Sequence, residues 1–267
     1  MSIWRHRRTR SAGTLLLFAL LTWPVTARAQ ANPAIHPDTL FVTGERIVIS
    51  PGSGGVTGGV EWLHAIAPTR SINAGVLTFR VGDSLWTYGR IGTMWPVTES
   101  TSVRVQTDVG AGRDANDRFP YFTVQGAISH DIVTRRLTLE AGHQYVHIHT
   151  TAGHSGRVGV AYRAGHLWTI GAAFHSSFGT SLGVRAATLR IARDVRLATI
   201  FGGLSSGTSR PALIGTAATG APADVRELYG GAIFPIGRFS LTAAISALDT
   251  NATRKRSFVL SWKLPLP

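Results

Sequence analysis

The chain has 267 residues, no cysteine and a formal net charge of +13. Without cysteine it cannot be a disulfide-stabilised secreted domain, and its singly scattered arginines lack the Lys/Arg blocks with interleaved aromatics of a nucleic-acid site. The 44% hydrophobic content is broken up by polar residues, which excludes an α-helical inner-membrane protein.

The N-terminus has the three parts of an export signal. Arginines at positions 5, 7, 8 and 10 form a basic region, residues 12–23 are uncharged and apolar, and Ala27-Arg28-Ala29 fits a cleavage site. The apolar stretch is too short for a helix that spans a bilayer, which needs about 20 residues. We therefore predict a signal peptide over residues 1–29 and a single mature domain over residues 30–267.

The mature part alternates between short periodic segments and turns. In residues 239–247, Phe239, Leu241 and Ile245 alternate with Ser240, Thr242 and Ser246. Successive side chains of a strand point to opposite faces, so one face of this segment is apolar and the other polar. Fourteen segments of this kind are predicted, in chain order: 39–49, 56–66, 72–81, 85–95, 101–109, 119–129, 136–149, 157–163, 167–174, 181–191, 195–203, 225–234, 239–247 and 256–264.

The predicted fold is all-β: a closed antiparallel transmembrane β-barrel of about fourteen strands, with twelve as the alternative, reached after export. If the first strand runs outward, the periplasmic connections are all short, whereas residues 110–118, 150–156 and 204–224 form long outer loops. Short periplasmic turns and long outer loops are typical of outer-membrane barrels. A secreted β-sandwich is the competing architecture, but it gives no reason for short connections at one end of the strands and long connections at the other.

Parts of the chain resemble the YaiO-type outer-membrane β-barrel family. The resemblance is carried by Phe119-Pro-Tyr-Phe-Thr-Val-Gln-Gly, Leu137-Thr-Leu-Glu-Ala-Gly-His-Gln-Tyr145, Gly156-Arg-Val-Gly-Val-Ala-Tyr162, Tyr229-Gly-Gly-Ala-Ile-Phe-Pro-Ile-Gly and Leu260-Ser-Trp-Lys263. It implies a multi-pass barrel in the outer membrane, inserted by the barrel assembly machinery and surrounded by outer-membrane lipids and lipopolysaccharide. The family brings no settled enzymatic activity, so it assigns no catalytic residue. Such barrels usually end in an aromatic residue, a place that Leu264 takes here.

Charged residues of the predicted inner face suggest two interpretations of the lumen. The strand parity points these side chains inward: Glu61, Arg104, Asp108, Arg136, Glu140, Arg157 and Glu227. Glu140 and Arg157 lie on consecutive segments and are expected to pair. Because both signs are present, a salt-bridged filling is favoured over a selectivity ring for a small anion. Outward arginines near the outer rim are expected to meet lipopolysaccharide phosphates.

Two clusters invite chemical hypotheses. His143, His147, His149 and His154, with Glu140 nearby, could hold a metal, but zinc sites need three or four converging ligands and interfacial aromatic rings explain the cluster better. His154-Ser155 and His175-Ser176-Ser177, with Asp131 or Glu140, supply the residue types of a rim-sited hydrolase or acyltransferase acting on lipid or lipopolysaccharide. No Gly-x-Ser-x-Gly elbow accompanies them.

The aromatic residues fit a barrel as well. Trp62, Trp86, Trp95, Trp168 and Trp262 fall near strand ends and are interpreted as interfacial anchors. We predict a non-enzymatic barrel, either structural or a narrow passive channel for small solutes, with no catalytic, cofactor-binding or metal-binding residue. The barrel hydrolase is kept as the alternative function.

Overall fold

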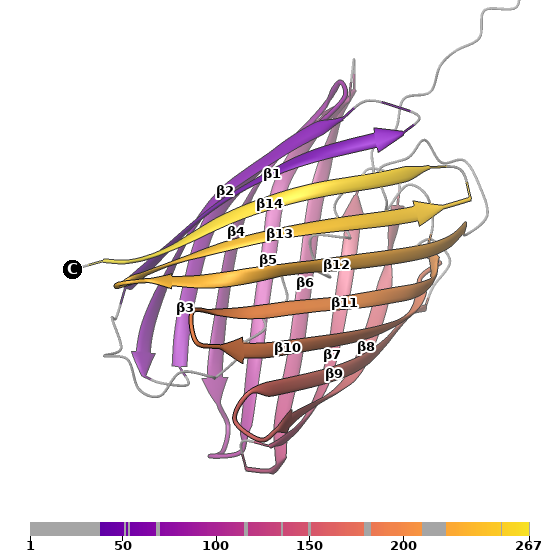
Figure 1. The fold of residues 1–267 in the computed structure, drawn as a ribbon. Coiled ribbons are helices and arrows are strands. Elements are labelled where there is room, and N and C mark those ends of the chain that lie inside the picture. Colours follow the sequence, from indigo (N-terminus) through magenta and orange to yellow (C-terminus); the bar gives the residue numbers. More distant parts are fainter. Residues whose placement is uncertain are drawn as a thin grey trace, which may run out of the picture.

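Every strand pairs antiparallel with its neighbours along the chain, and the first strand pairs with the last, which closes the sheet into a barrel (Figure 1). The structure is a computed structural model that describes residues 38–50, 52, 54–67, 70–114, 117–134, 136–148, 151–178, 183–209, 223–251 and 253–266. The predicted signal peptide lies outside these residues. The described residues contain no helix with the length and apolarity that a bilayer crossing requires.

The barrel has fourteen strands, as the sequence predicted. They are β1 (Asp38–Ser50), β2 (Gly55–Ala67), β3 (Arg70–Val81), β4 (Ser84–Pro96), β5 (Thr101–Asp114), β6 (Asp117–Val133), β7 (Leu137–Ile148), β8 (Thr151–Ala164), β9 (Trp168–Phe178), β10 (Arg185–Val195), β11 (Ala198–Ser209), β12 (Ala223–Ile236), β13 (Phe239–Thr250) and β14 (Arg254–Pro265).

The alternation predicted for each strand sorts side chains between the outside and the lumen. On β13, Phe239 and Ile245 are exposed on the outer surface, whereas Ser246 is buried inside, where its hydroxyl hydrogen-bonds that of Ser257 on β14 at 2.8 Å. The outer surface is largely apolar between the two ends of the barrel, and Ile91 on β4 is 65% exposed there. A closed sheet with an apolar exterior and a polar interior is suited to hydrocarbon outside and water inside.

The two ends of the barrel differ. We call the end where β1 begins and β14 ends the terminal end, and the opposite end the loop end. Connections at the terminal end are residues 68–69, 97–100, 134–136, 165–167, 196–197 and 237–238, which confirms the short turns predicted there. At the loop end the connections are residues 51–54, 82–83, 115–116, 149–150, 179–184, 210–222 and 251–253.

Two predicted outer loops are wrong. Residues 110–114 and 117–118 continue β5 and β6, and residues 151–156 belong to β8, so the connections between these strands are short. The polar, glycine-rich composition of residues 110–118 suggested a turn, but its glycines serve the interior of the sheet. A Cβ atom on Gly112 would fall within the ring of Phe119, which lies directly opposite on β6.

The same arrangement recurs around the lumen. Gly110 lies under Tyr88, Gly171 under Arg190, and Gly203 under Tyr229. Each glycine faces inward and leaves space for a large side chain on the adjacent strand. Glycine within these strands therefore lets the barrel accommodate large side chains within its interior.

Candidate functional site

A belt of charged side chains lines the lumen. Its members all lie on the inward face of their strands, and basic and acidic residues are equal in number. The charge belt comprises Glu45, Glu61, Arg90, Arg104, Asp108, Glu140, Arg157, Arg190, Glu227 and Lys255.

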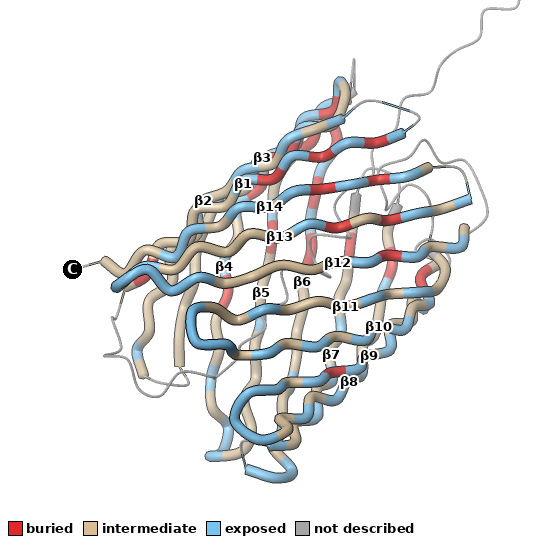
Figure 2. The backbone as a smooth tube through the Cα atoms, viewed as in Figure 1, coloured by how far each residue is buried: buried red, intermediate tan, exposed pale blue. Residues whose placement is uncertain are grey.

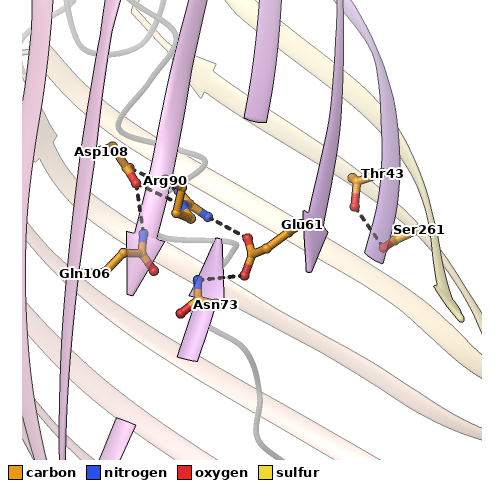
Figure 3. Close-up of polar contacts among 7 residues, drawn as sticks. All are labelled: Thr43, Glu61, Asn73, Arg90, Gln106, Asp108 and Ser261. Atoms are coloured by element: carbon orange, nitrogen blue, oxygen red, sulfur yellow. Dashed lines mark hydrogen bonds and ion pairs between the residues drawn. The ribbon is translucent and has the colours of Figure 1, made fainter. Parts of the chain in front are cut away.

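Arg90 organises the first part of the belt (Figure 3). Its Nε and Nη2 donate to the two carboxylate oxygens of Asp108, at 2.8 and 3.1 Å, and its Nη1 lies 3.5 Å from Glu61 Oε2. Asn73 donates to the other Glu61 oxygen at 3.0 Å, and Gln106 donates to Asp108 Oδ1 at 3.3 Å. Neighbouring strands β2 to β5 thus supply a fully polar wall segment in which each charge has a partner.

Glu140 organises the second part. Its carboxylate oxygens lie 3.2 Å from Arg157 Nη2 and 3.8 Å from Arg190 Nη2. The pairing of Glu140 with Arg157, predicted from the sequence, is confirmed. Arg104 lies within electrostatic range of both Glu140 and Glu61, so it connects the two parts of the belt.

The third part of the belt crosses the seam where the barrel closes. Glu45 on β1, Lys255 on β14 and Glu227 on β12 are all buried and interact electrostatically with one another. Thr57 donates a hydrogen bond to Glu45 Oε2 at 3.1 Å. A lysine between two carboxylates compensates part of their charge in a region that water reaches poorly.

Aromatic side chains of β3, β4 and β6 pack together inside the barrel, between the belt and the loop end. We call them the aromatic cap: Phe79, Trp86, Tyr88, Phe119 and Tyr121. The ring of Trp86 meets that of Phe119 edge-on at a centroid distance of 4.8 Å, and Tyr88 lies 4.9 Å from Tyr121. Trp86 is only 1% exposed. The cap therefore narrows the interior by close packing of rings.

The exposure of the inward side chains differs between the two halves of the lumen. On β1, β13 and β14 most inward residues of the loop-end half are buried, including Ile47, Ser257 and Lys255, whereas most of those of the terminal-end half, such as Ser240 and Ser261, are half-buried. Figure 2 shows this as buried segments gathered on the loop-end side of β1, β12, β13 and β14. The interior along these strands is therefore more accessible to solvent in the terminal-end half than in the loop-end half.

Two residues assigned from the sequence are placed elsewhere. Arg136, expected inside, lies exposed in the turn between β6 and β7, because β7 begins only at Leu137. Trp86, interpreted as an interfacial anchor, belongs to the aromatic cap. Tyr88 and Arg90, which follow at alternate positions of β4, face inward as well. The position of Trp86 near a strand end therefore did not indicate on which face of the sheet its side chain lies.

The other four predicted anchors lie on the outer surface near the terminal end. Trp95 and Trp168 are exposed, and each carries an arginine over its ring, Arg70 at 4.4 Å and Arg193 at 4.9 Å. Trp262 is exposed as well, and Trp62 donates to Asp38 at 2.8 Å. These positions match those of an aromatic girdle.

The described histidines of the cluster and Glu140 lie on opposite faces of the sheet. His143 and His154 face outward, 3.1 Å apart between Nε2 and Nδ1, and stack with Phe178. Glu140 faces the lumen on the other side, and His149 lies outside the described residues. Across the described positions no group of three or more potential metal ligands is found.

The residues of the hydrolase hypothesis are likewise separated. His154 points to the outer surface and Ser155 to the lumen. Ser177 Oγ accepts a hydrogen bond from the backbone N–H of Val184 at 2.8 Å, and Asp131 accepts one from Thr138 at 2.7 Å. In the described parts of the chain, no hydrogen bond joins any of these serines to His154 or His175.

Sequence comparisons return no relative: no family model matches the chain, and no curated protein does. Solved structures do match. The toluene transporter TodX of Pseudomonas putida superposes with a TM-score of 0.66 at 9% identity, covering 96% of this chain and 95% of that one. The monoaromatic hydrocarbon channel CymD gives 0.64 at 8% identity over 86% and 89%. Omp33 of Acinetobacter baumannii gives 0.54 at 11% identity over 86% and 100%.

At these identities the likeness establishes the fold. Together with the apolar exterior, the polar interior and the closed sheet of fourteen strands, it identifies the chain as an outer-membrane β-barrel protein.

Proposed function

We propose that the protein is a narrow passive channel for small solutes. The observation that carries the proposal is the construction of the lumen: a polar wall that water reaches from the terminal end, a charge-balanced belt, and an aromatic cap that narrows the passage. The belt would discriminate weakly between anions and cations because it holds equal numbers of both charges. The cap would select by size.

The fold relatives support a channel. TodX is described as a toluene transporter and CymD as a monoaromatic hydrocarbon channel. Both share the barrel architecture with this chain, so a transport role is compatible with the fold. The low identity leaves the solute of this chain to be found by experiment.

Three further assignments belong to this proposal. The terminal end faces the periplasm, since β1 begins and β14 ends there and all its turns are short, whereas the two longest connections, residues 179–184 and 210–222, lie at the loop end. Residues 1–29 direct export, as their arrangement of charge and apolar residues suggests. We also propose that the barrel assembly machinery inserts the chain and that it is a member of the YaiO-type family, which the segments quoted above resemble.

Planar bilayers test the channel directly. Purified protein is expected to give small, discrete conductance steps, and Trp86→Ala is expected to enlarge them because it removes the largest ring of the cap. Phe122→Ala is the matched control, since Phe122 lies on the outer surface of the same region. Its steps should equal those of the wild type. A silent bilayer for both wild type and Trp86→Ala would show a purely structural barrel.

A further inference from the structure

Outward-facing arginines form a row across one side of the barrel near the loop end. Seven residues, one on each of seven neighbouring strands, are direct cross-strand partners in sequence around the barrel. From β14 through β1 to β6 they are Phe258, Arg46, Val56, Arg80, Leu85, Arg113 and Arg118. We call Arg46, Arg80, Arg113 and Arg118 the arginine row. Its arginines are exposed, and so are the apolar residues between them.

The spacing is set by the sheet. Strands lie about 4.8 Å apart, so Arg46, Arg80 and Arg113 follow one another at roughly 10 Å. Arg113 and Arg118 are direct cross-strand partners, with Cα atoms roughly 5 Å apart. Like charges placed opposite one another destabilise a sheet unless an anion lies between them.

None of the ion pairs seen among the described side chains involves the arginine row. Within the described residues, no ion pair joins any of its four members to an acidic side chain, and the outward pair of Arg254 with Asp249, at 3.6 Å, lies outside the row. Arginines of the terminal end are arranged differently. Arg70 and Arg193 each lie over a tryptophan ring. The arginine row thus presents exposed guanidinium groups next to exposed apolar side chains.

This pattern matches a lipid with phosphate groups and several acyl chains. A guanidinium group donates two parallel hydrogen bonds to phosphate oxygens, and this preference exceeds that of lysine. Exposed Val56, Leu85 and Phe258 offer apolar surface to hydrocarbon beside those contacts. A free phosphate ion would use the arginines but not the apolar residues.

We infer that the arginine row binds the phosphate groups of lipopolysaccharide, with the acyl chains of its lipid A lying on Val56, Leu85 and Phe258. The lipid phosphate separates Arg113 from Arg118 and removes their repulsion. The site lies on the outside of the barrel, so it is independent of the proposed channel. It also places the loop end in the outer leaflet, where this lipid resides.

Thermal unfolding of the purified full chain in a zwitterionic detergent tests the inference. Bisphosphorylated lipid A is expected to raise the Tm of the wild type. In Arg113→Gln/Arg118→Gln the lipid concentration for half of that effect should rise at least tenfold. Without lipid, the double variant should unfold at the same temperature as the wild type or higher, because the like-charge pair is gone. A variant that merely folds badly would show the opposite change.

Controls distinguish lipid from other anions and this site from others. Arg70→Gln/Arg193→Gln, at the terminal end, should leave the half-effect concentration unchanged, whereas Arg113→Lys/Arg118→Lys should give an intermediate value because charge remains and bidentate geometry is lost. Arg80→Gln should weaken the response independently of the Arg113–Arg118 pair. An equal Tm shift with inorganic phosphate, or an unchanged lipid A response in Arg113→Gln/Arg118→Gln, would overturn the inference. Conductance of the double variant should match that of the wild type, so failure here leaves the channel proposal standing.

Discussion

Arg90 on β4 and Asp108 on β5 form a two-point ion pair inside the barrel. The two residues are direct cross-strand partners, so the backbone pairing of the sheet holds their side chains side by side. Nε–Oδ1 and Nη2–Oδ2 distances are 2.8 and 3.1 Å, and the side chains are 8% and 6% exposed. Glu61 from β2 joins the same guanidinium group, which links the wall across three inter-strand pairings.

Removing this guanidinium group should destabilise the barrel. Arg90→Leu leaves the buried Asp108 and the half-buried Glu61 without their shared cation, and breaking a buried pair such as Arg90–Asp108 costs about 3–5 kcal/mol. Arg90→Leu/Asp108→Leu should recover part of the loss, because it removes one uncompensated carboxylate. Urea unfolding of the protein in lipid vesicles measures both. Equal destabilisation in the single and double variants would contradict the coupling.

Gly112 should not tolerate a side chain. In Gly112→Ala the new Cβ atom meets the ring of Phe119, so the cap must shift, at a cost of about 1–3 kcal/mol. Gly126→Ala is the matched control on β6, since no atom lies within 4 Å of the Cβ that it adds. The same unfolding assay compares the two. A loss in Gly126→Ala as large as in Gly112→Ala would show that glycine matters for backbone reasons alone.

Much of this architecture follows from the sequence. The number of strands and the inward positions of Arg104, Asp108 and Glu140 were predicted, because strand periodicity is local and a charged side chain near the middle of a membrane strand must face water. Both signs of charge on one parity also pointed to the pairing of Glu140 with Arg157.

Other parts could not be predicted because they depend on neighbours. Arg90 was not assigned to the lumen, because the segment from Leu85 to Trp95 carries large residues at both odd and even positions. The pairing of this segment with β5 is needed to identify its inner face. The extent of β5 and β8 was underestimated because glycine usually marks a turn, whereas Gly112 makes room for a ring on the next strand. The arginine row likewise exists only in the register of six paired strands.

The belt should set a weak ion preference that single charges can shift. Glu140→Gln removes a negative charge between Arg157 and Arg190 and should move the reversal potential in a KCl gradient toward anions. Arg157→Gln should move it toward cations. Phe122→Ala, on the outer surface, should leave the potential unchanged. Shifts of the same sign in Glu140→Gln and Arg157→Gln would mean that the belt does not contact the permeating ions.

The most direct test of the account is a cysteine scan along β13 in the native membrane. The chain contains no cysteine, so each introduced cysteine is the only thiol of the protein that can be labelled. Single cysteines at residues 239 to 246 are exposed to a charged, water-soluble maleimide. The account predicts alternation: Ser240→Cys and Thr242→Cys react, Phe239→Cys, Leu241→Cys and Ile245→Cys are protected by lipid, and Ser246→Cys reacts slowly because it is buried in the loop-end half. Uniform labelling of both parities, together with protein that dissolves without detergent, would contradict a barrel with hydrocarbon outside and water inside.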